Sequence, residues 1–223
     1  MKVDMAETAP ETTQAQSAYR RIEEMIVTLA LAPGSRISES SIAQQLGMGR
    51  TPVREAMQRL AREGSLSILP RAGAIVSEID ITDQFKLIEL RREVERVVIG
   101  RAARLANAEA RQQFCDLRDR FLKAAEVNDD AGFMAADREF NAAIVATADN
   151  KYATTVMGPI QAQTRRFWYL NFSKFGELGR VAAAHAQIAD AVASNDETRA
   201  RESSDALIDY VEEYTMKTLQ ALL

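Results

Sequence analysis

The sequence predicts a mainly α protein: an N-terminal winged helix-turn-helix domain followed by a C-terminal all-α bundle of about six helices. Three observations support this prediction. Helix-forming residues dominate, and the 223-residue chain holds only 10 Gly and 5 Pro. Strand-like alternation of apolar residues is confined to a short stretch after Gly64. Apolar residues recur at helical spacing throughout the chain beyond Thr82.

Composition excludes several classes of protein. The longest apolar runs are far shorter than a membrane span, and the N-terminus lacks the basic-then-apolar order of a secretion signal. The single cysteine, Cys115, excludes an internal disulfide, and the single histidine limits any His-rich metal site. We therefore expect a cytoplasmic protein with no membrane partner and no cofactor.

Charge is unevenly distributed along the chain. Residues 17–77 hold eight Arg and five Glu, a net charge of +3, whereas residues 1–16 carry −2 and residues 78–223 carry −5. A basic part joined to an acidic part fits a DNA-binding domain attached to a body that stays off DNA. We predict a disordered arm over 1–16, a DNA-binding domain over 17–77, and a helical domain over 78–223.

The first predicted helix runs from Ser17 to Leu31 and stops at Ala32-Pro33-Gly34. Its apolar positions are Tyr19, Ile22, Ile26 and Leu29. Arg36-Ile37 then leads into a short helix capped by Ser38 or Ser40. This helix turns Ile42, Ala43 and Leu46 inward and is closed by Gly47 in a left-handed conformation.

The next helix, over residues 50–60, is the predicted DNA reader. Read as a helix, it places Val53, Ala56, Met57 and Leu60 on one apolar face. Arg50, Thr51 and Arg54 lie near its start on the opposite side, where Pro52 is tolerated in the first turn. Arginines at a free helix start suit phosphate oxygens and guanine edges in a major groove. A solvated surface face is the alternative interpretation.

Beyond Gly64 the apolar period changes from helical to alternating. Leu66 and Ile68 are expected on one face, Pro70-Arg71-Ala72-Gly73 forms a turn, and Ala74-Ile75-Val76 returns. A β-hairpin behind a recognition helix is a wing. Arg71 at its tip is placed to meet DNA phosphates or a minor groove, although an ordinary exposed turn residue is an equal alternative.

Thr82 or Asp83 is expected to cap a long helix that runs to about Ala106, with apolar positions at Phe85, Ile88, Leu90, Val94, Val97 and Ile99. The other five helices are expected over Glu109–Val127, from the Asn128-Asp129-Asp130 turn to Ala148, and over Tyr152–Phe172, Leu178–Ser194 and Asp196 to the C-terminus. Together they can bury a core as a bundle.

The order and spacing of these residues resemble a known family. The head resembles that of GntR transcription regulators through Pro33-Gly34-x-Arg36-Ile37-Ser38-Glu39, Leu46-Gly47-x-x-Arg50-Thr51-Pro52-Val53-Arg54-Glu55-Ala56, Leu60-x-x-Glu63-Gly64 and Gly73-Ala74-Ile75-Val76. The body resembles the FCD ligand-sensing domain of the FadR-type branch through Arg91 with Glu95, Asp137-Arg138-Glu139-Phe140, Asn150, His185-x-x-Ile188-x-x-Ala191, Asp196 and Ala200.

The resemblance implies a homodimeric regulator, more often a repressor, that a metabolite releases from or retains on a double-stranded operator. It implies that residues 78–223 form the effector-binding and dimerisation domain. It also implies that Arg50, Thr51 and Arg54 contact the operator. Lesser candidates for DNA contact are Arg36, Pro52, Arg71 and Gly73.

Many FCD domains hold a metal with one Asp and three His, and this chain departs from that pattern. The corresponding positions are Asp137, Asn141, His185 and Leu207. An amide is a weak substitute for imidazole, and leucine cannot bind a metal. We expect the metal to have been lost, and a divalent ion retained by Asp137, Asn141 and His185 is the less favoured alternative.

The remaining polar residues predict a site for a small acidic effector. A carboxylate or phosphate would lie between Arg91, His185 and either Arg165 or Arg166, beside Asp137 and with Asn141 as a hydrogen-bond partner. Phe167, Trp168, Tyr169 and Phe172 would form apolar walls or a stacking surface. The alternatives are a satisfied Asp137–His185 pair, an Arg91–Glu95 intrahelical pair, and aromatic residues used for the core or a dimer contact.

Two rival functions remain open at this stage. One is a metal-dependent hydrolase or lyase on the helical body, with Asp137 and His185 as ligands or acid and base. The other is a helical interaction module without a ligand. The sequence carries no nucleophile motif and no Gly-rich phosphate loop, which favours a transcription regulator rather than an enzyme.

Overall fold

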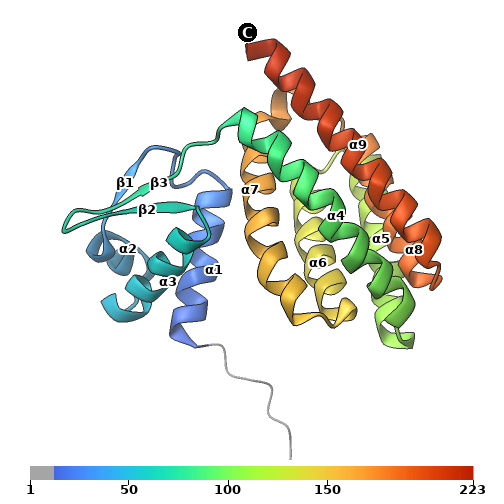
Figure 1. Cartoon of the computed structure of the whole chain (residues 1–223), viewed down its shortest axis with the longest axis horizontal. Helices are drawn as coiled ribbons and strands as arrows, with labels where there is room; N and C mark the ends of the chain where they lie inside the picture. Colours follow the sequence, from blue (N-terminus) through green and yellow to red (C-terminus); the bar gives the residue numbers. More distant parts are fainter. Residues whose placement is uncertain (1–12, 223) are drawn as a thin grey trace, which may run out of the picture. The chain divides into compact units, whose positions relative to one another are not determined.

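The computed structural model describes residues 13–222, apart from the side chains of 173–175 and 222. The chain divides between Ile79 and Asp80 into two compact units, and Figure 1 gives the order of their helices and strands. The predicted boundary lay between residues 77 and 78. Of the predicted arm, residues 1–12 lie outside the described residues, and residues 14–16 belong to the first helix.

Helix α1 spans Gln14–Val27 and begins before the predicted start. A capping box sets this start: the backbone N–H of Gln16 donates to the Thr13 hydroxyl, and the Gln16 side chain accepts from the Thr13 N–H, each at 3.2 Å. The helix ends at Val27 rather than at the predicted Leu31. Leu29, an expected helical position, lies in the following turn with a φ of 61°.

Two short helices complete the helix-turn-helix. Helix α2 spans Glu39–Leu46 with Ser38 as N-cap, and α3 spans Arg50–Arg62. Gly47 ends α2 with a φ of 63°, which confirms the predicted left-handed closure. The predicted inward face of α3 is also confirmed, and it joins α1, α2 and the strands in one core: Ala18, Tyr19, Ile22, Ile26, Ile42, Ala43, Leu46, Val53, Ala56, Met57, Leu60, Leu66, Ala74 and Val76.

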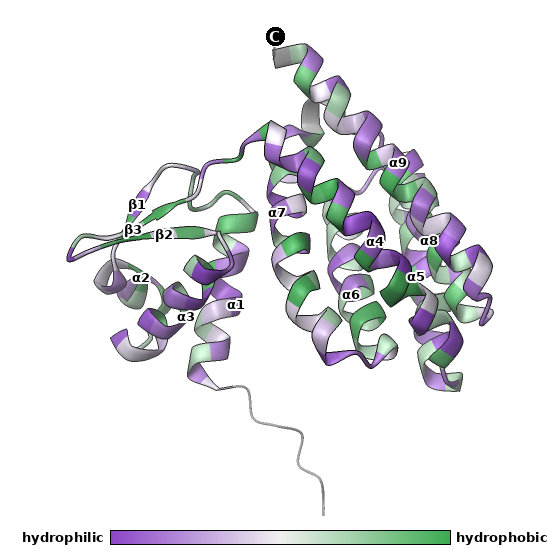
Figure 2. Cartoon of the chain, in the orientation of Figure 1, coloured by the Kyte–Doolittle hydropathy of each residue, from purple (hydrophilic) through white to green (hydrophobic). Residues whose placement is uncertain are grey.

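The wing is a three-stranded antiparallel sheet in the order β1-β3-β2, not only a hairpin. Strands β2 (Leu66–Leu69) and β3 (Gly73–Val76) form the predicted hairpin. The extra strand, β1 (Arg36–Ile37), was expected only as a lead-in to α2, but it pairs with β3. Ile68 is 47% exposed although it shares a strand face with the buried Leu66. Figure 2 shows an apolar hairpin with a hydrophilic tip.

The second unit contains the six predicted helices and no strand among its described residues. They are α4 (Ile81–Leu105), α5 (Ala108–Val127), α6 (Asp130–Ala148), α7 (Lys151–Phe175), α8 (Leu178–Ala193) and α9 (Glu197–Leu222). Helix α8 packs against α5 and α9, and α4 packs against α9, α6 and α7. The N-cap of α4 is Asp80, not Thr82 or Asp83, because its carboxylate accepts the Thr82 N–H at 2.7 Å. None of the described helices is long and apolar enough to cross a membrane.

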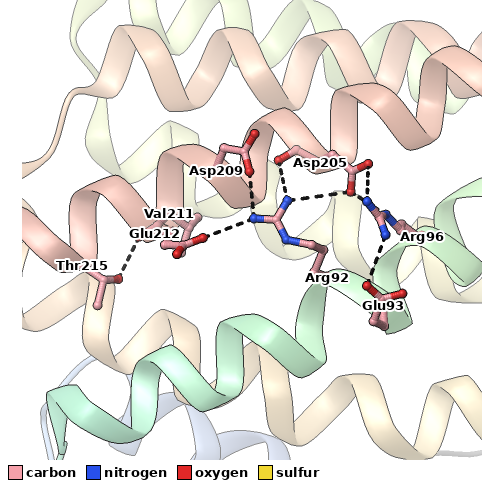
Figure 3. Close-up of polar contacts among 8 residues, drawn as sticks. All are labelled: Arg92, Glu93, Arg96, Asp205, Asp209, Val211, Glu212 and Thr215. Atoms are coloured by element: carbon pink, nitrogen blue, oxygen red, sulfur yellow. Dashed lines mark hydrogen bonds and ion pairs between the residues drawn. The ribbon is translucent and has the colours of Figure 1, made fainter.

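Arginines of α4 hold α9 in place through an ion-pair network (Figure 3). Arg92 contacts Asp209 at 2.8 Å and Glu212 at 3.3 Å, and Arg96 contacts Asp205 at 2.7 Å. Because these groups are partly exposed, the network contributes mainly to orientation rather than to stability.

The apolar positions expected along α4 divide between the core and the surface. Ile88 and Ile99 are buried, whereas Leu90 and Val97 are each 51% exposed. Leu90 and Val97 are seven residues apart on one side of α4, and Leu105, which is 45% exposed, follows near the helix end. The face of the helix that carries them is therefore not buried within the described chain.

Candidate functional site

The exposed start of α3 carries the side chains predicted to read DNA. Arg50, Thr51 and Arg54 are all exposed, while the opposite face of the helix is in the core. Gly49 is the N-cap and makes no side-chain hydrogen bond there, so backbone N–H groups of the first turn have no side-chain cap. Such a helix start presents both cationic side chains and backbone donors, which is the chemistry that phosphate oxygens and base edges require.

Arg54 is held by a carboxylate from the preceding helix. Its Nε lies 3.0 and 2.9 Å from the two carboxylate oxygens of Glu39, and its Nη2 lies 2.9 Å from Oε2. The Arg54 side chain nevertheless remains 59% exposed. The guanidinium is therefore oriented by α2 and still accessible from outside.

The wing adds Arg36 and Arg71 to the exposed cations of α3. Arg36, Arg50 and Arg71 form no hydrogen bond or ion pair with other described residues, so their charges are available to a polyanion. Arg71 lies at the hairpin turn with a φ of 63°, a conformation that costs an ordinary residue about 1–2 kcal/mol. The hairpin turn therefore holds an exposed arginine in a left-handed backbone conformation that arginine rarely adopts.

Gly73 and Pro52 have structural reasons to occupy their positions, whether or not they touch DNA. Gly73 has a φ of 91°, and a Cβ there would lie 2.2 Å from the carbonyl oxygen of Ile37. Glycine is therefore needed for β3 to pass β1. Pro52 is half-buried in the first turn of α3, where no intrahelical partner for an N–H is lost.

Within the second unit, a cavity of about 50 Å³ lies among α4, α6, α7, α8 and α9. One water molecule needs roughly 10–15 Å³ by this measure, so the space holds several water-sized groups. The cavity is lined by Arg91, Phe133, Met134, Asp137, Asn141, Gln161, Thr164, Arg165, Trp168, Val181, His185, Leu207 and Val211. All four positions that correspond to the FCD metal ligands line this one space.

A chain of hydrogen bonds occupies one side of the cavity. His185 Nε2 lies 3.2 Å from Asp137 Oδ1, and the Asn141 amide donates to the same oxygen at 2.9 Å. Gln161 in turn donates to Asn141 Oδ1 at 2.9 Å. The amide oxygen of Asn141 thus already accepts a hydrogen bond and its nitrogen already donates. Few hydrogen-bonding positions of Asn141 therefore remain for the effector contact expected from the sequence.

The Asp137–His185 pair is buried and strongly oriented. His185 Nδ1 lies 2.8 Å from the carbonyl of Val181, which can only accept, so Nδ1 carries hydrogen and Nε2 faces Asp137. Burial alone would raise the pKa of Asp137. The hydrogen bond and charge of His185, with the charges of Arg165 and Arg91, outweigh burial and hold that pKa below its ordinary value.

The imidazole of His185 is enclosed by aromatic rings. The ring centroids of Phe121, Phe133 and Phe140 lie 5.0, 5.4 and 5.7 Å from it. This apolar shell strengthens the electrostatic interaction between His185 and Asp137 by excluding water. Asp137 and His185 also line the cavity, so the rings cover the imidazole without closing the pair off from that space.

The three predicted arginines have different surroundings. Arg91 lines the cavity but its Nε donates to Glu95 at 2.6 Å, as the intrahelical alternative predicted. Arg165 lines the cavity and forms no ion pair or hydrogen bond with another described residue. Arg166 is fully buried and donates to Gln163 at 2.9 Å. The choice left open by the sequence is thereby resolved in favour of Arg165 as the cavity cation.

The aromatic residues of α7 are also divided. Trp168 lines the cavity and stacks on Phe172 with ring centroids 4.6 Å apart, whereas Phe167 packs edge-on against Tyr214 of α9. The rings beside His185 come instead from α5 and α6 and were not anticipated. Their signal was readable, because Phe133 and Phe140 are seven residues apart on α6, either side of Asp137. Gln161 was also missed, since polar residues on a buried helix face carry no periodic signal.

The donor set does not fit a resident metal. Asp137 and His185 supply an oxygen and a nitrogen, but Asn141 directs its N–H groups at Asp137, and Leu207 supplies no lone pair. Among the residues that the structure describes, no cluster of three or more His, Cys, Asp and Glu could hold an ion. Asn141 donates to Asp137 and Gln161 donates to Asn141, so these two amides are used for hydrogen bonds where a metal would need further ligands.

Comparisons with known proteins agree with this architecture. Residues 14–76 match bacterial regulatory proteins of the gntR family, and residues 86–210 match the FCD domain. An HTH-type transcriptional regulator of the ttuE-ttuC' intergenic region of Agrobacterium vitis is 36% identical over 135 residues, 59% of this chain and 79% of that relative. The HTH-type transcriptional repressor RspR of Escherichia coli is 27% identical over 181 residues, 81% of this chain and 79% of that relative.

A solved structure has the same fold. The structure of E. coli McbR/YncC matches with a TM-score of 0.81 and 19% sequence identity, and the match covers 93% of this chain and 99% of that one.

Proposed function

We infer the function of this chain from its family: it belongs to the GntR family of bacterial regulatory proteins, and residues 86–210 form an FCD domain. It is a DNA-binding transcription regulator with a ligand-sensing domain. Beyond this, the contacts with operator DNA, the class of effector, the metal content, the sign of regulation and the oligomeric state are our proposals.

We propose that α3 enters the major groove and that Arg50, Thr51 and Arg54 contact the operator. Three features support this assignment: their exposure, the buried opposite face of α3, and the orientation of Arg54 by Glu39. Arg36 and Arg71 are proposed to contact phosphates, because both are exposed cations without an ionic partner among the described residues. Repression is favoured because RspR carries that description.

The working form is proposed to be a homodimer that places two heads on the half-sites of a palindromic operator. The exposed apolar side chains of α4, at Leu90, Val97 and Leu105, support burial against a second copy. The same arrangement would let a ligand in the body change the spacing of the heads, provided that it binds one dimer geometry more tightly than the other.

The effector is proposed to be a small acidic metabolite bound in the cavity without a metal. The observation that carries this proposal is Arg165, the cavity cation that lacks a hydrogen-bonded or ionic partner among the described residues. A half-buried guanidinium whose N–H groups have no hydrogen-bond partner favours a bound carboxylate, which it can hold with two parallel hydrogen bonds.

A metabolite panel tests this function. The full chain is mixed with a duplex that carries the DNA upstream of its own coding sequence, and small carboxylic acids are screened for loss of binding. At least one acid should release the wild-type protein, and Arg165→Ala should keep operator binding while losing that response. A panel in which no acid changes DNA affinity would reject the proposed effector class.

A further inference from the structure

The indole of Trp168 has a buried donor with no assigned role. Trp168 is 9% exposed, lines the cavity, and packs against Phe172 and Tyr214 with ring centroids 4.6 and 4.8 Å away. Its Nε1–H finds no acceptor among the described residues. A buried donor without a partner is destabilising, and native proteins fill such positions with water or a ligand.

Most other polar side chains of the cavity are already paired by hydrogen bonds or ionic contacts. Arg91 is paired with Glu95, and Asp137 with His185. Asn141 is saturated by Asp137 and Gln161, and the Thr164 hydroxyl donates to the carbonyl of Ile160 at 3.0 Å. Of the polar side chains that line the cavity, the Arg165 guanidinium and the Trp168 indole are the two that form no hydrogen bond with a described residue.

We propose that Trp168 determines effector specificity by donating its indole N–H to a neutral oxygen acceptor of a compact monocarboxylate. This inference rests on the proposed effector site and narrows it. Arg165 takes the carboxylate, and Trp168 takes a carbonyl or hydroxyl oxygen elsewhere on the same molecule. A second carboxylate would face the carboxylate of Asp137 without a second free cation, so a dicarboxylate is disfavoured. The cavity of about 50 Å³ has room for a compact ligand of this kind.

The sequence supplies a direct probe, because Trp168 is the only tryptophan of the 223 residues. The intact protein therefore gives one indole N–H signal by NMR and one tryptophan emission. Matched pairs of probes isolate the acceptor: pyruvate against propanoate, and 2-oxobutanoate against butanoate, which share charge and chain length. Each oxo acid should bind the wild-type protein about tenfold or more tightly than its partner and should shift the indole N–H signal.

Two variants complete the test, with calorimetry as the readout. Trp168→Phe keeps an aromatic ring but removes the donor, so it should bind both members of a pair with similar affinity. Tyr214→Phe keeps the indole donor and a ring packed on Trp168, and it changes a residue outside the cavity lining, so it should retain the preference. Equal affinities in the wild type, an unshifted indole signal, a preference that survives in Trp168→Phe, or no binding by any of the four probes would overturn the proposal. If another acid still releases operator DNA, the proposed function stands while this specificity assignment fails.

Discussion

Arg54 of the recognition helix lies in the carboxylate fork of Glu39, with Nε 3.0 Å from Oε1 and Nη2 2.9 Å from Oε2. The hydrogen bond and charge of Glu39 raise the pKa of the Arg54 guanidinium. In the exposed setting of this pair the energetic gain is small, so the main effect is to restrict the rotamers of a long side chain. An arginine oriented in this way meets a base edge with less loss of conformational entropy.

The first prediction concerns this orientation. Glu39→Gln should lower the ratio of operator affinity to scrambled-duplex affinity, because Arg54 becomes mobile while the head gains positive charge. Both affinities are measured by fluorescence anisotropy at the same salt concentration. Glu55→Gln is the matched control, since Glu55 is an exposed glutamate of α3, the helix that carries Arg54. An equal change of the ratio in both variants would contradict a positioning role for Glu39.

The second prediction concerns the close contact between β1 and β3. Gly73→Ala should destabilise the head by about 3 kcal/mol or more, because it adds both a left-handed φ and a clash with the Ile37 carbonyl. Gly47→Ala is the control: its φ is 63°, but a Cβ there meets nothing within 4 Å, so it should cost only about 1 kcal/mol. Denaturant unfolding of both variants measures the difference. Similar losses in the two would show that the β1–β3 contact is not tight.

The third prediction is a pH dependence. The pKa of Asp137 is lower in the folded chain than its ordinary value of 3.8, so its charged form stabilises the fold. That stabilisation is complete above pH 3.8 and is lost as the pH falls through the folded pKa. The advantage of the wild type over Asp137→Asn in free energy of unfolding should therefore shrink on acidification from about pH 5 to about pH 3. An advantage that stays constant over this range would contradict a lowered pKa of Asp137 in the folded chain.

The fourth prediction concerns the metal. The wild-type protein should contain no stoichiometric divalent ion in the cavity after purification, because Asp137 and His185 are the only described residues of its lining with suitable donors. Asn141→His combined with Leu207→His rebuilds an Asp and three His around the cavity and should gain metal. Elemental analysis and zinc titration of both proteins provide the measurement. Tight metal binding by the wild type would overturn the assignment of a metal-free cavity.

Local patterns predicted much of the head and less of the site. The inward face of α3 and the closure at Gly47 follow from residues within one or two helical turns, and both were predictable. Strand β1 was not, because a two-residue strand has no period and exists only through pairing with β3. The capping box at Thr13 was readable but missed. Arg165 could not be distinguished from Arg166, because the rotation of α7 is set by the helices that it packs against.

The cavity illustrates the same limit. Asp137, Asn141 and His185 were placed together by their resemblance to a family pattern, whereas Gln161 joins them from another helix through a contact 20 residues away in sequence. Leu90 and Val97 fit the helical period of α4 and still lie at the surface. Periodicity identifies a face of a helix but not what covers that face.

Operator binding by Arg54→Ala tests the central claim most directly. Full-length wild type, Arg54→Ala and the charge-matched control Arg62→Ala are titrated with the upstream duplex at physiological salt. Loss of a bidentate base contact at Arg54 predicts an affinity lower by about 1–3 kcal/mol per head, with the Arg62 variant close to wild type and the response of Trp168 fluorescence to small acids intact. Wild-type operator affinity in Arg54→Ala would contradict the account.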